Sequence, residues 1–129
     1  TTEVLSKDDY VFDFTDGTVA IKGGNNGRWA FGDGALAMIA GNINGDDRIN
    51  ILGVDNDGTD IRQAIFNDPG NFFNLPSYSI NGYSVFDVNM NGQANILGTS
   101  NDATLIRNIL ITAPANFFNL PSFFFQQQF

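Results

Sequence analysis

The chain has 129 residues, a formal net charge of −8 at neutral pH, and neither cysteine nor histidine. This is the length of one domain, or of one domain with a small appendage, and the negative charge argues against nucleic-acid binding, which needs a basic face. Without cysteine and histidine the chain lacks a disulfide framework, the usual zinc ligands and the usual general base. No stretch reaches the roughly 18 apolar residues of a membrane-spanning helix.

The first 40 residues predict a meander of three or four short strands. Residues 10–14 alternate between apolar and polar, and Asp16-Gly17 is a hairpin turn signal that leads into a return strand at 19–21. After a glycine-rich turn, further strands are expected at 29–31 and 35–39. Such a sheet is too small to form a sandwich alone. We therefore expect it to pack on the rest of the chain, or to be completed by strands from elsewhere.

From residue 42 onwards the chain is a duplication. The segment Asn-Phe-Phe-Asn-Leu-Pro-Ser occurs at 71–77 and again at 116–122, and 116 − 71 = 45. The same offset carries Asn50-Ile-Leu-Gly53 onto Asn95-Ile-Leu-Gly98. An internal repeat outranks other signals when a fold is predicted. Each repeat is expected to contain a loop, a helix and an extended segment rich in phenylalanine.

One short amphipathic helix is predicted in each repeat, from Thr59 to about Phe66 and from Ala103 to about Ile111. Ile61 and Ile65 are four residues apart and therefore lie on one face of the first helix. A proline after each helix ends it, because proline cannot continue a helix. Helices this short are marginal on their own. We therefore expect the two apolar faces to pack together, with Arg62 and Arg107 exposed to solvent.

Side chains that carry oxygen alternate along the loop before each helix. They are Asn42, Asn44 and Asp46 in the first repeat and Asp87, Asn89 and Asn91 in the second. An EF-hand calcium loop takes side-chain ligands from positions 1, 3 and 5 and a backbone carbonyl from position 7. Arg48 and Gln93 stand at position 7 and would give only their carbonyl oxygens. Calcium prefers oxygen ligands, so the sequence predicts two Ca²⁺ sites.

The closing ligand of these loops differs from the EF-hand pattern. Position 12 would be Gly53 or Gly98, which carry no side chain, and both copies reach Asn-Asp soon afterwards. We therefore expect an enlarged loop that is closed by Asp57 in the first repeat and by Asp102 in the second. Asp55 is the alternative to Asp57 as a ligand.

The two loops also differ at position 6, where the EF-hand has a glycine. The second loop has Gly92 there, whereas the first has Asp47, so the second is the stronger prediction. Because many ligands are asparagine instead of aspartate, we expect weak affinity, in the ~10⁻⁴–10⁻³ M range of extracellular modules.

The duplicated loops resemble dockerins, in particular the dockerin-like segment of secreted proteins from Bacteroidota-type bacteria. The resemblance is carried by residues 87–92 and Asn101-Asp102 and, less closely, by residues 42–57, and it covers about residues 40–112. It implies an extracellular, non-catalytic, EF-hand-like calcium-binding module that holds proteins together. It does not name the partner.

The chain ends in a tail that is rich in phenylalanine, residues 123–129. Its aromatic members are Phe123, Phe124, Phe125 and Phe129, and burying one such side chain is worth roughly 1.5–3 kcal/mol. One alternative is that the tail folds back onto the N-terminal sheet of its own chain. The other is that it adds as a donor strand to the sheet of the next subunit, which would build an open filament.

The predicted class is α+β, with a small antiparallel β-meander packed on a duplicated calcium loop–helix module. The meander covers residues 1–40, the two repeats cover 41–122, and the tail 123–129 is the candidate donor strand. No cleft with paired acids is evident, so we expect no enzymatic activity. The expected function is that of an extracellular or cell-surface structural or adhesive module that self-associates head to tail into a filament. The alternative is a dockerin-type adaptor that binds a cohesin-like receptor on another protein.

Overall fold

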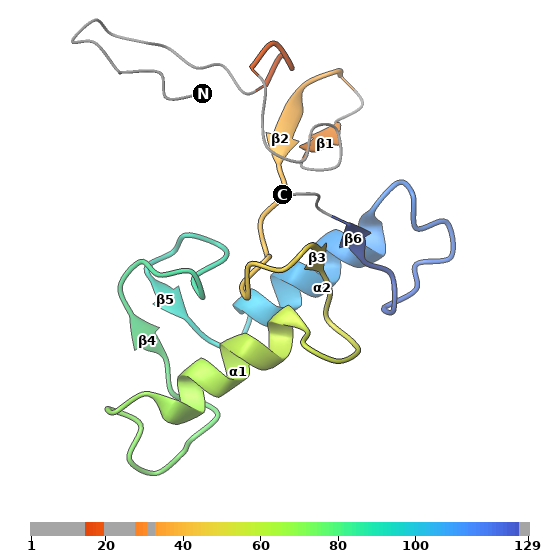
Figure 1. Cartoon of the computed structure of the whole chain (residues 1–129). Coiled ribbons are helices and arrows are strands. Elements are labelled where there is room, and N and C mark those ends of the chain that lie inside the picture. The colour runs from red at the N-terminus through yellow and green to blue at the C-terminus, as the bar shows by residue number, and fades with distance from the viewer. Residues whose placement is uncertain (1–14, 20–27, 31–32, 127–129) are drawn as a thin grey trace, which may run out of the picture. The chain divides into compact units, whose positions relative to one another are not determined.

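The computed structural model describes residues 15–19, 28–30 and 33–126, and its elements are labelled in Figure 1. The chain divides into two units, Thr1–Ile39 and Ala40–Phe129. The described elements are two helices and three antiparallel two-stranded sheets, so the α+β class is confirmed. Neither helix in the described residues is long and apolar enough to cross a membrane.

The first unit contains one antiparallel strand pair in its described part. Strand β1 (Arg28–Ala30) pairs with β2 (Leu36–Met38), and these overlap the third and fourth predicted strands. The predicted strand at 10–14 lies outside the described residues, as does most of the one at 19–21. The predicted turn is present: Asp16 Oδ1 accepts hydrogen bonds from the Thr18 N–H at 2.8 Å and from its hydroxyl at 2.7 Å.

The second unit is built on two helices, α1 (Asp57–Asn67) and α2 (Asp102–Thr112). An asparagine caps each helix: Asn56 Oδ1 accepts from the Thr59 N–H at 2.9 Å, and the equivalent bond of the second repeat measures 2.8 Å. Such caps satisfy an N–H group that the helix itself leaves unpaired. Both predicted helices are confirmed, and each begins one or two residues earlier than predicted because the cap lies further upstream.

The core of the second unit is aliphatic and lies between the helices, which contact each other. Ile61 and Ile65 of α1 and Ile106 and Leu110 of α2 are fully buried, as the periodicity predicts. The other buried apolar residues of the described chain are Ile49, Val88, Ala94 and Ala113. Arg62 and Arg107 are exposed, which confirms their predicted orientation.

Two small sheets join the repeats reciprocally. Strand β4 (Ile80–Asn81) pairs with β5 (Gln93–Ala94), and β3 (Arg48–Ile49) pairs with β6 (Phe125–Gln126). Adding 45 to the numbers of β3 gives β5, and adding 45 to those of β4 gives β6. The segment after each helix therefore pairs with the loop of the other repeat, as Figure 1 shows.

The tail takes a third course that neither predicted alternative included. Phe125 lies opposite Ile49 in the β3–β6 pair, so this part of the tail pairs with the first loop of its own chain, and not with a strand of the N-terminal sheet. The rings of Phe123 and Phe125 meet edge to face, with centroids 5.4 Å apart. This course follows the repeat: β4, the equivalent strand of the first copy, pairs in the same way with β5 in the loop of the second copy. Phe129 lies outside the described residues.

Candidate functional site

Asparagine and aspartate side chains curl the second predicted calcium loop. Asp87 accepts hydrogen bonds from the N–H groups of Asn91 at 3.0 Å and of Gly92 at 2.8 Å, one on each carboxylate oxygen. Asn89 Oδ1 accepts from the Asn91 N–H at 3.0 Å, and Asn91 Oδ1 accepts from the Gln93 N–H at 2.9 Å. Local bonds of this kind are the reason that Asn and Asp favour turns. They bring positions 1, 3, 5 and 7 into one tight turn.

The first loop is curled in a similar way. Asn42 Oδ1 accepts from the Gly45 N–H at 2.8 Å, Asn44 Oδ1 from the Asp46 N–H at 3.0 Å, and Asp46 Oδ1 from the Arg48 N–H at 2.6 Å. An oxygen that accepts one hydrogen bond keeps a second lone pair. Asn44 Oδ1 and Asp46 Oδ1 each accept one of these bonds, which leaves each of them a lone pair.

A fully buried carboxylate at the start of each helix closes its loop. Asp57 is 0% exposed, and its two oxygens accept from the N–H groups of Ile43 at 2.6 Å and of Asn50 at 2.8 Å. The second repeat has the equivalent bonds from the N–H groups of Val88, Asn89 and Asn95 to Asp102, at 2.8, 3.2 and 2.8 Å. Closure is thus made at Asp57 and Asp102 through the backbone, and their role as calcium ligands stays a prediction.

A second closing bond repeats in the same register. The Asn44 Nδ2 group donates to the carbonyl of Asp55 at 2.9 Å, and the Asn89 Nδ2 group donates to the carbonyl of Ser100 at 2.7 Å. Both accepting residues have a positive φ, +53° and +62°, which is uncommon outside glycine. The repeat of this conformation in two different residue types indicates that the loop closure imposes it. Asp55 enters the closure through its carbonyl oxygen.

The backbone paths differ at the sixth position. Gly92 has φ +84°, whereas Asp47 is not among the residues with positive φ. Gly45 and Met90 share the positive φ at position 4, +71° and +59°. Of positions 4 and 6, the first loop has a positive φ only at position 4, so its position 6 accommodates an aspartate without strain.

Two carboxylates at the first loop and the start of α1 have a raised pKa. Burial raises the pKa of Asp57, against hydrogen bonds from the backbone that lower it. Burial also raises the pKa of Asp60, and the nearby charges of Asp55 and Asp46 add to this rise. The Arg48 Nε atom lies 3.6 Å from Asp47 Oδ1, but both side chains are half exposed, so this ion pair offsets little.

Buried oxygen atoms without a hydrogen-bond donor occur at the same place in both loops. They are the Oδ1 atoms of Asn50 and Asn95, and 95 − 50 = 45. A buried acceptor without a donor is costly, and a hard cation bound through oxygen would satisfy it. Within the described ranges, no three His, Cys, Asp or Glu side chains form a group that could hold a metal ion. The loops therefore fit Ca²⁺ only if amide and carbonyl oxygens supply many of the ligands, as the sequence predicts.

The second unit has two exposed aromatic turns that the sequence pattern does not predict. They are residues 71–75 and 116–120, which we term the aromatic turns. Phe72 and Phe73 are 86% and 83% exposed, and Phe117 and Phe118 are 88% and 83% exposed. The available signal was the repetition, without a change, of two adjacent phenylalanines outside the periodic helical segments.

A buried asparagine holds each aromatic turn in place. Asn71 is only 5% exposed. Its Nδ2 group donates to the carbonyls of Ile65 at 2.9 Å and Leu75 at 3.1 Å, and its Oδ1 accepts from the Leu75 N–H at 2.8 Å. Asn116 makes the same three bonds, to Leu110 and Leu120. The phenylalanines are therefore held out in water by a fixed turn that is anchored to the end of its helix.

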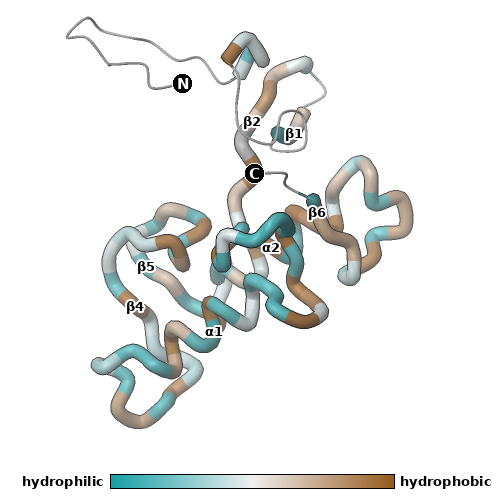
Figure 2. Tube along the Cα trace, viewed as in Figure 1, coloured by the Kyte–Doolittle hydropathy of each residue, from teal (hydrophilic) through white to brown (hydrophobic). Residues whose placement is uncertain are grey.

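The aromatic turns lie at opposite ends of the second unit. In Figure 1 one follows α1 and the other follows α2, with the helix pair between them. Figure 2 shows apolar residues in both of these outlying loops. The second unit thus carries two copies of one exposed aromatic turn, one after each helix.

The comparisons with known proteins do not extend this description, because no protein-family model, no curated protein and no solved structure matches the chain.

Proposed function

We propose that the second unit is a calcium-stabilised structural module that joins copies of this chain head to tail through its aromatic turns, at the cell surface or in the extracellular space. The observation that carries this proposal is the duplication of the turns. Four phenylalanines, each at least 83% exposed, are held by two identical hydrogen-bonded turns. Contiguous exposed apolar surface marks interaction sites.

Placement at opposite ends makes the module bivalent. A contact at one end leaves the other end free, so each added copy presents a new apolar surface. Contacts that do not close into a ring build an open filament. The strand β6 is already paired within its own chain, so the aromatic turns, and not a donor strand, are the proposed contacts.

Bound Ca²⁺ would balance the negative charge of the loop carboxylates. The residues that would hold it are Asn42, Asn44, Asp46, the carbonyl of Arg48 and Asp57 in the first loop, and Asp87, Asn89, Asn91, the carbonyl of Gln93 and Asp102 in the second. Because Asp57 and Asp102 are also the first residues of the helices, the order of each loop and the start of its helix are coupled. Metal binding that orders such loops contributes to folding stability.

The alternative function is a dockerin-type adaptor that binds a receptor on another protein. The observation that favours it is the matched pair of exposed arginines, Arg62 and Arg107, on the two helices. An adaptor would be a stable monomer in solution that waits for a separate partner.

A series of variants separates the two functions. Replacing all four phenylalanines by serine should leave a folded monomer at concentrations at which the wild type forms large particles. Replacing only Phe117 and Phe118 should also prevent growth, because a head-to-tail contact needs the turns at both ends. Analytical ultracentrifugation measures both. A four-serine variant that still forms large particles, or a wild type that stays monomeric at all concentrations, would overturn the proposal of self-association.

A further inference from the structure

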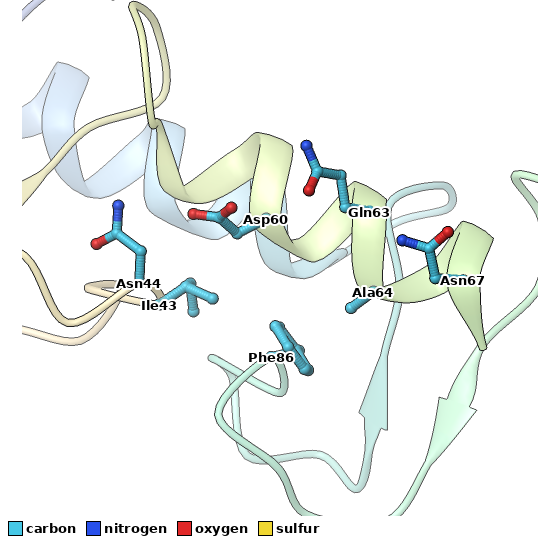
Figure 3. Close-up of a pocket in the computed structure, with 7 residues that line it drawn as sticks. All are labelled: Ile43, Asn44, Asp60, Gln63, Ala64, Asn67 and Phe86. Carbon is cyan, nitrogen blue, oxygen red and sulfur yellow. The ribbon is translucent and has the colours of Figure 1, made fainter.

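A hollow of about 370 Å³ lies between the first loop and helix α1. Figure 3 shows its surroundings: Ile43 and Asn44 come from the loop, Asp60 and Ala64 from the helix, and Phe86 from the segment before the second loop. Asp60 points toward Asn44 in this view. The volume falls within the range of small-molecule sites, about 300–1,000 Å³.

The second repeat shows that the fold does not need this hollow. Adding 45 to Asp60 gives Leu105, and adding 45 to Ala64 gives Ile109. The same helix face is thus aliphatic in α2 and carries a carboxylate and a small residue in α1. An aliphatic pair would pack there without a polar group to satisfy. The polar face of α1 therefore calls for an explanation other than packing.

The hollow is lined by a carboxylate with an oxygen that lacks a hydrogen-bond donor, and by an aromatic ring. Asp60 Oδ2 is buried and has no hydrogen-bond partner among the described residues. The charges of Asp55 and Asp46 also act on Asp60. Among the described residues that line the hollow there is no lysine or arginine, and the exposed Gln63 and Asn67 offer amide groups there.

We propose that this hollow binds an organic cation, an ammonium or guanidinium group such as the end of a lysine or arginine side chain of a partner protein. The cation would donate to Asp60 Oδ2, and a donor to a buried charged group is a strong hydrogen bond. The face of an aromatic ring also attracts such cations, and Phe86 provides that ring. A neutral sugar would satisfy the hydrogen bond but would leave the charge unbalanced. This inference does not depend on calcium binding or on the aromatic turns.

Isothermal titration calorimetry of the full chain with Nα-acetyl-lysine methylamide tests the proposal. The controls are the same molecule acetylated on its side-chain nitrogen and methyl β-glucoside. We expect saturable binding of the charged probe alone. Asp60→Asn and Asp60→Leu should each weaken binding by about tenfold or more, because the bond to a charged group is lost. Asp47→Asn removes an exposed acid of the first loop that does not line the hollow, and it should leave the affinity unchanged.

The titration is run in saturating calcium and again in chelator, and circular dichroism confirms that each variant is folded. Binding of the probe in both buffers supports the proposal, whether or not the loops bind Ca²⁺. Three outcomes overturn it: no saturable binding of the charged probe, equal binding of the neutral analogue or the sugar, and displacement of the probe by Ca²⁺ in competition. The last would assign Asp60 to the metal site. Should Asp60→Leu fail to fold, Asp60→Asn alone decides, because it keeps the shape of the side chain.

Discussion

At the scale of the residue, Asp57 and Asp102 each connect the start of a helix to two segments of the preceding loop. Each is fully buried at the first position of a helix and accepts hydrogen bonds from backbone groups on both arms of its loop. The pattern of the sequence predicted closure at these two positions. It did not predict backbone N–H groups as the partners, because an aspartate that binds metal and one that binds N–H groups look the same in a sequence.

Removing either carboxylate should destabilise the second unit even without calcium. Asp57→Ala or Asp102→Ala leaves buried N–H groups unpaired, which costs about 1–3 kcal/mol in the free energy of unfolding. Urea denaturation in chelator, followed by circular dichroism of the helices, measures this. Asp47→Ala is the matched control, because its side chain is 58% exposed, and it should change stability by less than about 0.5 kcal/mol. Equal stability of all three variants would contradict closure by hydrogen bonds.

The acids of the first loop predict how stability varies with pH. The pKa values of Asp57 and Asp60 are raised in the folded chain, chiefly by burial. The folded state therefore binds protons more tightly than the unfolded state, and protonation favours folding. In chelator, the contribution of these two groups to the free energy of unfolding should rise as the pH falls from 7 through their raised pKa values. It should level off near the ordinary value of 3.8.

The measurement compares urea midpoints at several pH values for the wild type and Asp60→Asn. The variant lacks one of the two raised groups, so its stability should rise less on acidification than that of the wild type. An identical pH dependence for the two proteins would show that Asp60 keeps its ordinary pKa in the folded chain.

At the scale of the element, the two helices followed from the sequence, but the short strands β3 to β6 and the aromatic turns did not. The helix positions were set by apolar spacing and by the prolines that end them, both of which are local signals. The anchor of each turn is a buried asparagine that bonds to the end of a helix six residues earlier. An exposed and a buried asparagine are identical in the sequence. The repeat identified the segment, and only the contacts identified its role.

The anchoring asparagines and the phenylalanines that they present should behave in opposite ways. Asn71→Ala removes three hydrogen bonds of a buried side chain and should lower the free energy of unfolding by about 1–3 kcal/mol. Phe72→Ser changes an exposed side chain and should alter it by less than about 0.5 kcal/mol. Urea denaturation below the concentration of self-association measures both. A large loss of stability for Phe72→Ser would mean that the ring is buried in solution.

At the scale of the whole molecule, the duplication explains where the tail lies. The sequence predicts burial of the tail's phenylalanines, but Phe124 remains 42% exposed, and both predicted destinations lay outside the repeats. The offset of 45 residues places β6 in the position that β4 holds in the first copy. The reciprocal pairing then closes the second unit.

Sedimentation velocity of the wild-type chain with calcium and with a chelator is the most direct test of a calcium-stabilised module that assembles through its own surface. We predict large particles in calcium, and their dissociation or a marked shift to smaller species in chelator, because the loops and helix starts lose order. A chain that remains monomeric in both buffers would contradict self-association. Particles that are indifferent to the chelator would contradict the role of calcium.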